Sequence, residues 1–166
     1  MNDPRTWEQF GRLIRYVGMG EIRARVILEN VVDRGRFLEG DLAESNIRRV
    51  EMEGIADTGA VLTLLPLEIV ERLGLRRTQK RIVLLANDQK IELDQADCLW
   101  IEIGDRSMTT TCLIGPPGCT MLIGQVVMES LDLIVDPLKR TLTPRPESPF
   151  LPTLNLKGMW SPAAVS

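Results

Sequence analysis

Asp57-Thr58-Gly59-Ala60 follows the apolar pair Ile55-Ala56 and precedes the apolar run Val61–Pro66. The stretch places one carboxylate in a short turn between two hydrophobic strands, where its surroundings can set its protonation. In an ordinary structural role, Asp57 would cap its own backbone and Gly59 would supply the turn conformation. In a catalytic role, the same carboxylate would activate a water molecule. Because a given tripeptide occurs by chance in roughly a few per cent of chains of this length, the choice depends on the rest of the sequence.

A second informative element lies about 65 residues further along the chain. Met121-Leu122-Ile123-Gly124 is an apolar run that ends in glycine, and a short helical segment and a strand-like run follow it. Together with the Asp57 turn, these segments resemble the retropepsin-like aspartic proteases, the single-lobe relatives of pepsin, from about Arg23 to Leu142. The parts that match in order are Asp57–Ala60, the hairpin around Ala86–Gln89, the strand Asp97–Ile103, the run Cys112–Pro117 and Leu122–Gly124.

The resemblance implies a mainly β fold, a closed barrel-like acid protease lobe with two short helices and a flap hairpin. It implies neither a cofactor nor a metal ion. Asp57 would be the catalytic carboxylate, Thr58 would hold the site by hydrogen bonding across a two-fold axis, and Gly59 would present its N–H to the carboxylate. Ala60 would keep the cleft floor small. Leu122, Ile123 and Gly124 would form the loop beneath the turn, although each also suits an ordinary core role.

The chemistry of this family requires two carboxyl groups. One carboxylate deprotonates water while a carboxylic acid protonates the carbonyl oxygen of the peptide bond, and two carboxyls about 3 Å apart share one proton. The chain has a single Asp-Thr-Gly, and no other acidic residue repeats its surroundings. We therefore expect a homodimer in which Asp57 faces Asp57 of a second copy across the axis.

The flap and the flanking positions depart from the viral pattern. The hairpin tip, formed by Ala86, Asn87, Asp88 and Gln89, is polar and lacks the usual glycine, so Asn87 or Asp88 is expected to adopt the left-handed conformation. Val61 and Leu62 stand where many retroviral members carry acidic residues that grip the substrate, and Gln125 stands where they carry an arginine that ties the dimer. The closing hairpin, Asp132–Thr143, is then expected to supply the interface, as in bacterial and ubiquitin-receptor relatives.

Composition, net charge and the absence of histidine exclude several classes of function. A chain of 166 residues with 44% hydrophobic residues suits one compact domain, and a net charge of −3 offers no basic field for nucleic acid. No apolar run approaches the ~18 residues that span a bilayer, and the start lacks the order of a signal peptide, so a soluble, cytoplasmic protein is expected. With no histidine and three cysteines, the sequence excludes Ser–His and Cys–His pairs and nearly all ordinary zinc sites.

The expected organisation has three parts: an N-terminal helical extension (1–18), the protease-like domain (19–143) and a proline-rich tail (144–166). The helix could dock on the domain or contact a partner or a second copy. The tail is expected to be extended, because its prolines exclude regular elements. Its removal is expected to leave the dimer and the activity largely unchanged, unless Phe150 to Trp160 lies in the cleft or on a second copy. Within the domain we expect strands at 21–29 and 46–56, a loop at 34–45, a helix at 66–73 ended by Gly74, the hairpin 80–99, paired strands at 99–103 and 108–114, and a helix at 125–131.

Two functions of different class remain open. The first is an aspartic endopeptidase that acts on a peptide or protein substrate with an apolar residue beside the cleaved bond. The alternative is a non-catalytic peptide-binding or dimerisation module on the same fold. The intact Asp57-Thr58-Gly59 favours the enzyme, since a binding module gains nothing from opposing two carboxylates.

Overall fold

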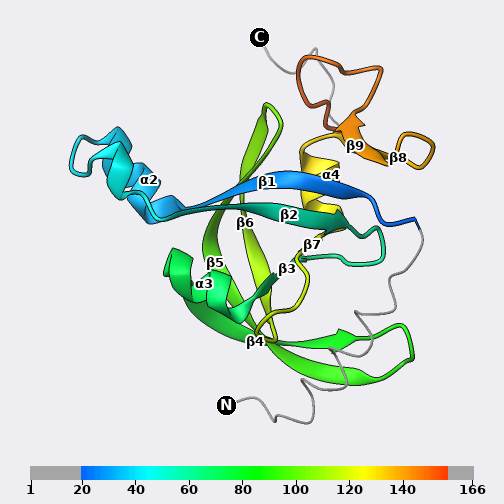
Figure 1. Cartoon of the computed structure of the whole chain (residues 1–166), viewed down its shortest axis with the longest axis horizontal. Helices are drawn as coiled ribbons and strands as arrows, with labels where there is room; N and C mark the ends of the chain where they lie inside the picture. Colours follow the sequence, from blue (N-terminus) through cyan, green and yellow to red (C-terminus); the bar gives the residue numbers. More distant parts are fainter. Residues whose placement is uncertain (1–19, 157–166) are drawn as a thin grey trace, which may run out of the picture.

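The computed structural model describes residues 20–156, so the helix expected at 1–18 lies outside the described residues (Figure 1). The described chain is mainly β, as expected from the sequence. Its strands are β1 (Arg23–Asn30), β2 (Arg49–Ala56), β3 (Thr63–Pro66), β4 (Arg76–Leu84), β5 (Lys90–Ile103), β6 (Arg106–Gly115), β7 (Leu122–Ile123), β8 (Leu133–Asp136) and β9 (Thr141–Pro144). Its helices are α2 (Val31–Leu38), α3 (Leu67–Leu73) and α4 (Gln125–Ser130), with a 3-10 turn η1 (Glu44–Asn46).

Seven strands form one sheet in the order β1-β2-β7-β3-β6-β5-β4. β5 also pairs with β1, so the pairings close a ring through the first six strands of this order and leave β4 outside it. The β2–β7 and β3–β6 pairs are parallel, and the other pairs are antiparallel. β8 and β9 form a separate two-stranded sheet. Two parallel pairs within a mainly antiparallel sheet bring the ends of β2 and β7 to the same place.

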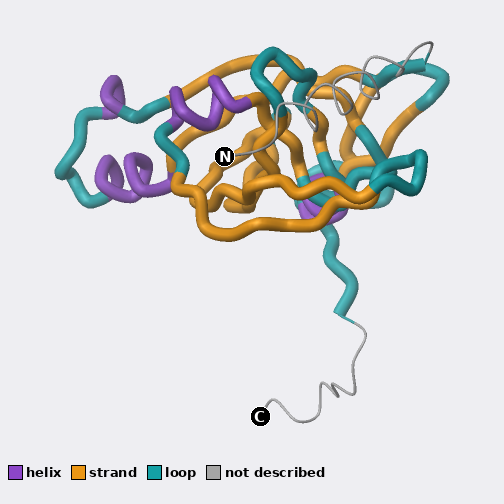
Figure 2. The backbone as a smooth tube through the Cα atoms, turned by 90° about the horizontal axis from the view of Figure 1, so that it is seen from below, coloured by secondary structure: helices purple, strands orange, loops and turns teal. Residues whose placement is uncertain are grey.

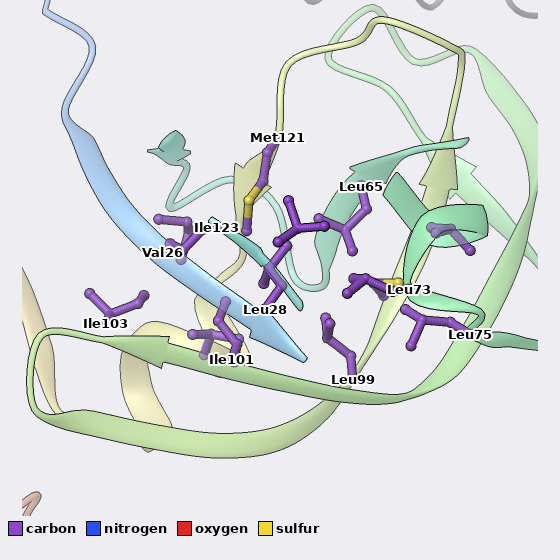
Figure 3. Close-up of a cluster of buried hydrophobic side chains, with 14 of the residues drawn as sticks. Val26, Leu28, Leu65, Leu73, Leu75, Leu99, Ile101, Ile103, Met121 and Ile123 are labelled. Carbon is purple, nitrogen blue, oxygen red and sulfur yellow. The ribbon is translucent and has the colours of Figure 1, made fainter. Parts of the chain in front are cut away.

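The hydrophobic core lies inside this curved sheet (Figure 3). Val26 and Leu28 of β1 are fully buried, as are Leu99 and Ile101 of β5 and Ile123 of β7. The alternation of apolar and charged residues in β1 places its apolar side chains on the inner face. Each such side chain stabilises the fold by about 1.5–3 kcal/mol relative to its exposed state. Ile123 is therefore both a core residue and a neighbour of the Asp57 turn.

Most of the expected elements are present. The helix after Pro66 ends at Gly74, whose φ of 61° lies in the left-handed region that terminates helices without strain. The hairpin β4–β5, the pair β5–β6, the helix α4 and the closing hairpin β8–β9 lie where the sequence placed them, within a few residues at their ends.

The loop expected over residues 34–45 is wrong, because α2 occupies Val31–Leu38. The side chain of Asn30 caps this helix by accepting hydrogen bonds from the N–H groups of Val32 (2.9 Å) and Asp33 (3.1 Å). Asp33 is buried and pairs with Arg48, which fixes the helix to the start of β2. Its apolar residues stand only at the two ends, Val31, Val32, Phe37 and Leu38, with charged residues and a glycine between them, so its sequence lacks the apolar spacing by which helices are recognised.

The described part of the tail, residues 145–156, contains no helix or strand, as expected, but some of it is bound to the domain. Ser148 is buried, and the backbone N–H of Thr153 donates to the carboxylate of Asp132 (3.0 Å). Residues 145–153 are therefore attached to the domain by hydrogen bonds. Residues 145–156 are called the C-terminal strap below.

Candidate functional site

The Asp57 turn begins where β2 ends. Ile55 and Ala56 pair with Leu122 and Ile123 of β7 in parallel register, and the N–H of Asp57 donates to the carbonyl of Ile123 (3.1 Å). The two sequence elements that carry the resemblance, about 65 residues apart, therefore lie side by side. This contact is the first of several that fix the position of Asp57.

The start of α4 is bound to the far side of the same turn. The N–H of Gln125 donates to the carbonyl of Ala60 (2.7 Å), and the N–H of Val126 donates to the carbonyl of Val61 (3.1 Å). The first N–H groups of a helix have no partner within the helix, and α4 has no side-chain cap. The carbonyls of the turn meet this need, so α4 and the turn hold each other in place.

Gly124 makes this close approach possible. A Cβ atom built on it would lie 2.4 Å from the carbonyl carbon of Leu62 and 2.7 Å from the nitrogen of Thr63. Both atoms belong to the backbone, so no change of side-chain rotamer can relieve the clash. The N–H of Gly124 donates to the hydroxyl of Thr63 (3.2 Å), a buried group. Glycine at this position is thus required by space, and its expected role as part of the loop beneath the turn agrees with the geometry.

Asp57 is half-buried, and its carboxylate makes few contacts that stabilise the fold. It accepts one hydrogen bond, from the N–H of Gly59 (2.9 Å), while the N–H of Ala60 donates to the Asp57 carbonyl (3.2 Å). Within residues 20–156 no lysine or arginine forms an ion pair with it. Thr58 and Gly59 are exposed at the apex of the turn, and Ala60 is half-buried. The backbone of Asp57 is therefore fixed by hydrogen bonds, whereas its carboxylate lies beside the exposed residues Thr58 and Gly59.

Two buried acidic side chains, those of Glu29 and Asp33, do form ion pairs. Glu29 pairs with Arg34 (2.5 Å) and Arg49 (3.1 Å), and Asp33 pairs with Arg48 (2.6 Å). The hydrogen bond from Arg48 lowers the pKa of Asp33 against the opposing effect of burial. Asp57 is less buried than these two residues, and it combines a backbone fixed by hydrogen bonds with a carboxylate that has no ion pair within residues 20–156.

The flap hairpin has the expected turn. The N–H of Leu85 donates to the carbonyl of Gln89 (2.8 Å), and the N–H of Asp88 donates back to Leu85 (2.9 Å). Asp88 has a φ of 64°, which confirms the expectation that Asn87 or Asp88 adopts the left-handed conformation. The side chain of Asn87 accepts from the N–H of Gln89 (3.2 Å). All four tip residues, Ala86 to Gln89, are exposed.

A second apolar cluster connects the base of this hairpin with the strands under the Asp57 turn. Leu64 of β3, with Ile91 and Leu93 of β5, forms its buried part. Val83, Leu85, Leu113, Cys119 and Leu122 pack around these residues. Leu64 pairs directly with Leu122, so β7 contacts both the flap cluster and the turn. In Figure 1 the flap tip and the β2–β3 turn both lie at the right-hand end of the molecule.

Sequence reasoning missed two contributors to the site. Thr63 was treated as part of an apolar run, although a lone hydroxyl in a buried strand signals a hydrogen bond to a neighbouring backbone. The apolar cluster was also missed, because its members come from five strands, β3 to β7, and from two loops that only the folded sheet brings together.

The remaining chemistry-bearing groups do not compete with Asp57. Burial raises the pKa of Cys112 and of Cys119 to about 12, so both are thiols at neutral pH and poor nucleophiles. Within the described residues, no three His, Cys, Asp or Glu side chains gather as metal ligands. None of the helices in residues 20–156 is long and apolar enough to cross a membrane.

Comparison with known proteins gives no match: no family model fits the sequence, and no curated protein is significantly similar to it.

Proposed function

We propose that this chain is a homodimeric aspartic endopeptidase of the retropepsin-like type, in which two Asp57 carboxylates activate water between them. The observation that carries the proposal is the Asp57 turn itself. Its backbone is hydrogen-bonded to Ile123, Gln125 and Val126, while its carboxylate has no charged partner among the described residues. The buried acidic residues Glu29, Asp33 and Asp132 pair with arginine, and Asp57 does not.

The reaction follows from two such carboxyl groups sharing one proton. The ionised carboxylate removes a proton from water, and the resulting oxygen nucleophile adds to the peptide carbonyl carbon while the neutral carboxylic acid protonates the carbonyl oxygen. The C–N bond then breaks, the leaving amine takes a proton, and the shared proton is restored. The exposed Thr58 is available to hydrogen-bond across the axis, which is the role the family resemblance implies.

The sheet supports the same proposal. Its ring of pairings is what a closed, barrel-like lobe requires, and the β8–β9 sheet suggests where the second copy binds. A sheet of two strands is marginally stable in water and presents unpaired backbone groups at both edges. Pairing of this hairpin with its counterpart in a second copy would satisfy those groups, in place of the charged tie that Gln125 does not provide.

The proposed substrate is an extended peptide with apolar side chains. Val61 follows the Asp57 turn and is 62% exposed, and Ile82 and Leu84 on the flap hairpin are 75% and 62% exposed. These side chains lie on the segments that would border a peptide above Asp57. An extended strand of substrate could hydrogen-bond to the flap through its backbone and place alternate side chains against these residues.

The test compares two substitutions that each remove one carboxylate from an exposed turn. Asp57→Asn should abolish cleavage of a denatured protein, whereas Asp88→Asn at the flap tip should retain most of it. Activity of the wild type should respond to a statine-type transition-state mimic and not to thiol reagents. An Asp57→Asn chain that still cleaves above a few per cent of wild type would rule the mechanism out. A wild-type chain that binds the denatured protein without cleaving it would instead establish the peptide-binding alternative.

A further inference from the structure

The C-terminal strap is fastened to one buried carboxylate. Asp132, at the end of α4 and the start of β8, is 4% exposed. It accepts hydrogen bonds from the hydroxyl of Ser148, from Nε of Arg145 (2.8 Å) and from the N–H of Thr153 (3.0 Å). Three donors from residues 145, 148 and 153 converge on a single side chain. The strap therefore follows one defined path over the domain.

Arg106 attaches the strap to the domain at a second place. Its guanidinium is buried, with 3% of the residue exposed, and donates to the carbonyls of Leu131 (2.7 Å), Asp132 (3.0 Å) and Ser148. No carboxylate within residues 20–156 forms an ion pair with it. A buried cation needs hydrogen-bond acceptors, and here the acceptors are the end of α4, the start of β8 and the strap. Arg106 thus joins β6 to all three.

Between its attachment points the strap presents large apolar side chains to solvent. Phe150 is 85% exposed and Leu151 is 76% exposed, although Ser148 and Thr153 on either side are fixed to Asp132. Leu154 and Leu156 beyond them are also exposed, at 68% and 83%. Figure 2 shows this segment leaving the body of the molecule on its way to the C-terminus. Exposed apolar side chains on a fixed backbone are typical of an interaction surface, since little ordering entropy is lost when a partner binds.

We propose that the strap, residues 145–156, is part of the interface with a second copy of this chain, with Phe150 and Leu151 as its main contacts. Asp132 and Arg106 act as positioning residues. This inference rests on the proposed function, in which the site is incomplete until a second copy supplies its Asp57.

The connectivity of the strap favours a second copy as the partner. The strap is bound to the end of α4, and the start of α4 is hydrogen-bonded to the Asp57 turn. A contact at the strap is therefore linked through one six-residue helix to the carboxylate that must meet its counterpart. The strap is also continuous with the β8–β9 hairpin, where Leu138 is 95% exposed and the strand edges are open. Strap, hairpin and turn form one connected path from the apolar contacts to the site.

The test uses surface substitutions that leave the fold intact. Phe150→Ser combined with Leu151→Ser should raise the dimer dissociation constant at least tenfold by sedimentation. The midpoint of urea unfolding in dilute, monomeric solution should not change. Leu38→Ser is the matched control, since Leu38 is 73% exposed on α2, far from the strap in Figure 1. It should change neither quantity.

Ser148→Ala tests the positioning residues, because it removes one hydroxyl donor to Asp132. Its specific activity should fall on dilution at a higher concentration than that of wild type, yet reach the same plateau when the protein is concentrated. A merely structural role would lower the plateau as well. A double variant at 150 and 151 that dimerises within twofold of an active, dimeric wild type would overturn this inference and leave the proposed function standing. A wild type that is active as a monomer would overturn both.

Discussion

Gly124→Ala gives the sharpest test of how the site is assembled. The added methyl carbon would lie 2.4 Å from the Leu62 carbonyl carbon, whereas carbon atoms in ordinary contact are about 3.5–4.0 Å apart. The obstacle is backbone, so the Leu62–Thr63 segment must move by about 1 Å. Overpacking of this kind costs about 1–3 kcal/mol, and disturbance of the hydrogen bonds of Gln125 and Val126 adds about 1 kcal/mol each.

We therefore expect Gly124→Ala to lower the free energy of unfolding by about 3 kcal/mol, measured by urea denaturation with an unchanged slope. In a chain of this size the melting temperature should fall by roughly 6–12 °C. Cleavage should be lost even where the variant is folded, because the turn and α4 no longer hold Asp57 in place. Gly35→Ala is the control. The added Cβ meets nothing within 4 Å, and the substitution replaces a glycine inside helix α2. It should stabilise the chain by about 0.5–1 kcal/mol. A Gly124→Ala chain as stable as wild type would contradict the packing argument.

Three further outcomes follow from the same geometry. Gly59→Ala should reduce cleavage while leaving the unfolding free energy nearly unchanged, because its Cβ would meet only the Asp57 carboxylate oxygen, at 3.2 Å. Truncation after Pro144 should destabilise the chain by about 1–3 kcal/mol in thermal or urea unfolding, since Arg106 loses the Ser148 carbonyl in a buried position; equal stability would contradict it. The hydrogen bond from Ser148, with those from Arg145 and Thr153, lowers the pKa of Asp132 from 3.8 to about 2, so its stabilising effect should be complete above pH 4 and decline between pH 4 and pH 2. Asp132→Asn should lose less stability than wild type over that pH range.

The turn at Asp57 could be predicted from local chemistry, whereas its contact with Leu122–Gly124 was expected only from the family resemblance. Asp57-Thr58-Gly59 and Leu122-Ile123-Gly124 each combine an apolar strand with a glycine at a fixed place. Strands, their turns and the two short helices also follow from periodicity and from prolines and glycines, which act over a few residues. The flap turn at Asp88 belongs to the same class, since a polar residue that tolerates positive φ is needed there.

The strap could not be predicted, because its attachment depends on polar residues far apart in the chain. Arg106 lies between the paired strands expected at 99–103 and 108–114, and Asp132 begins the expected closing hairpin; neither position has a periodic signal that points to Ser148. The apolar residues of the strap face solvent, so no core pattern identifies it either. α2 was missed for a related reason, since the Asn30 cap and the Asp33–Arg48 pair stabilise a helix whose apolar residues do not recur at helical spacing.

The two kinds of acidic residue in this chain show why the site can be identified without a catalytic triad or a metal. Glu29, Asp33 and Asp132 are each surrounded by donors, and each stabilises the fold because its charge is satisfied. Asp57 is fixed as firmly through its backbone, yet its carboxylate has one neutral N–H donor and an open side. Holding a charge in position without pairing it brings no stability to one chain. The arrangement becomes useful when a second carboxylate is brought opposite, since the two then share a proton that either can give or take. The hydrogen bonds that fix the backbone of Asp57 leave its carboxylate without an ion pair, and this is the basis of the proposed dimer.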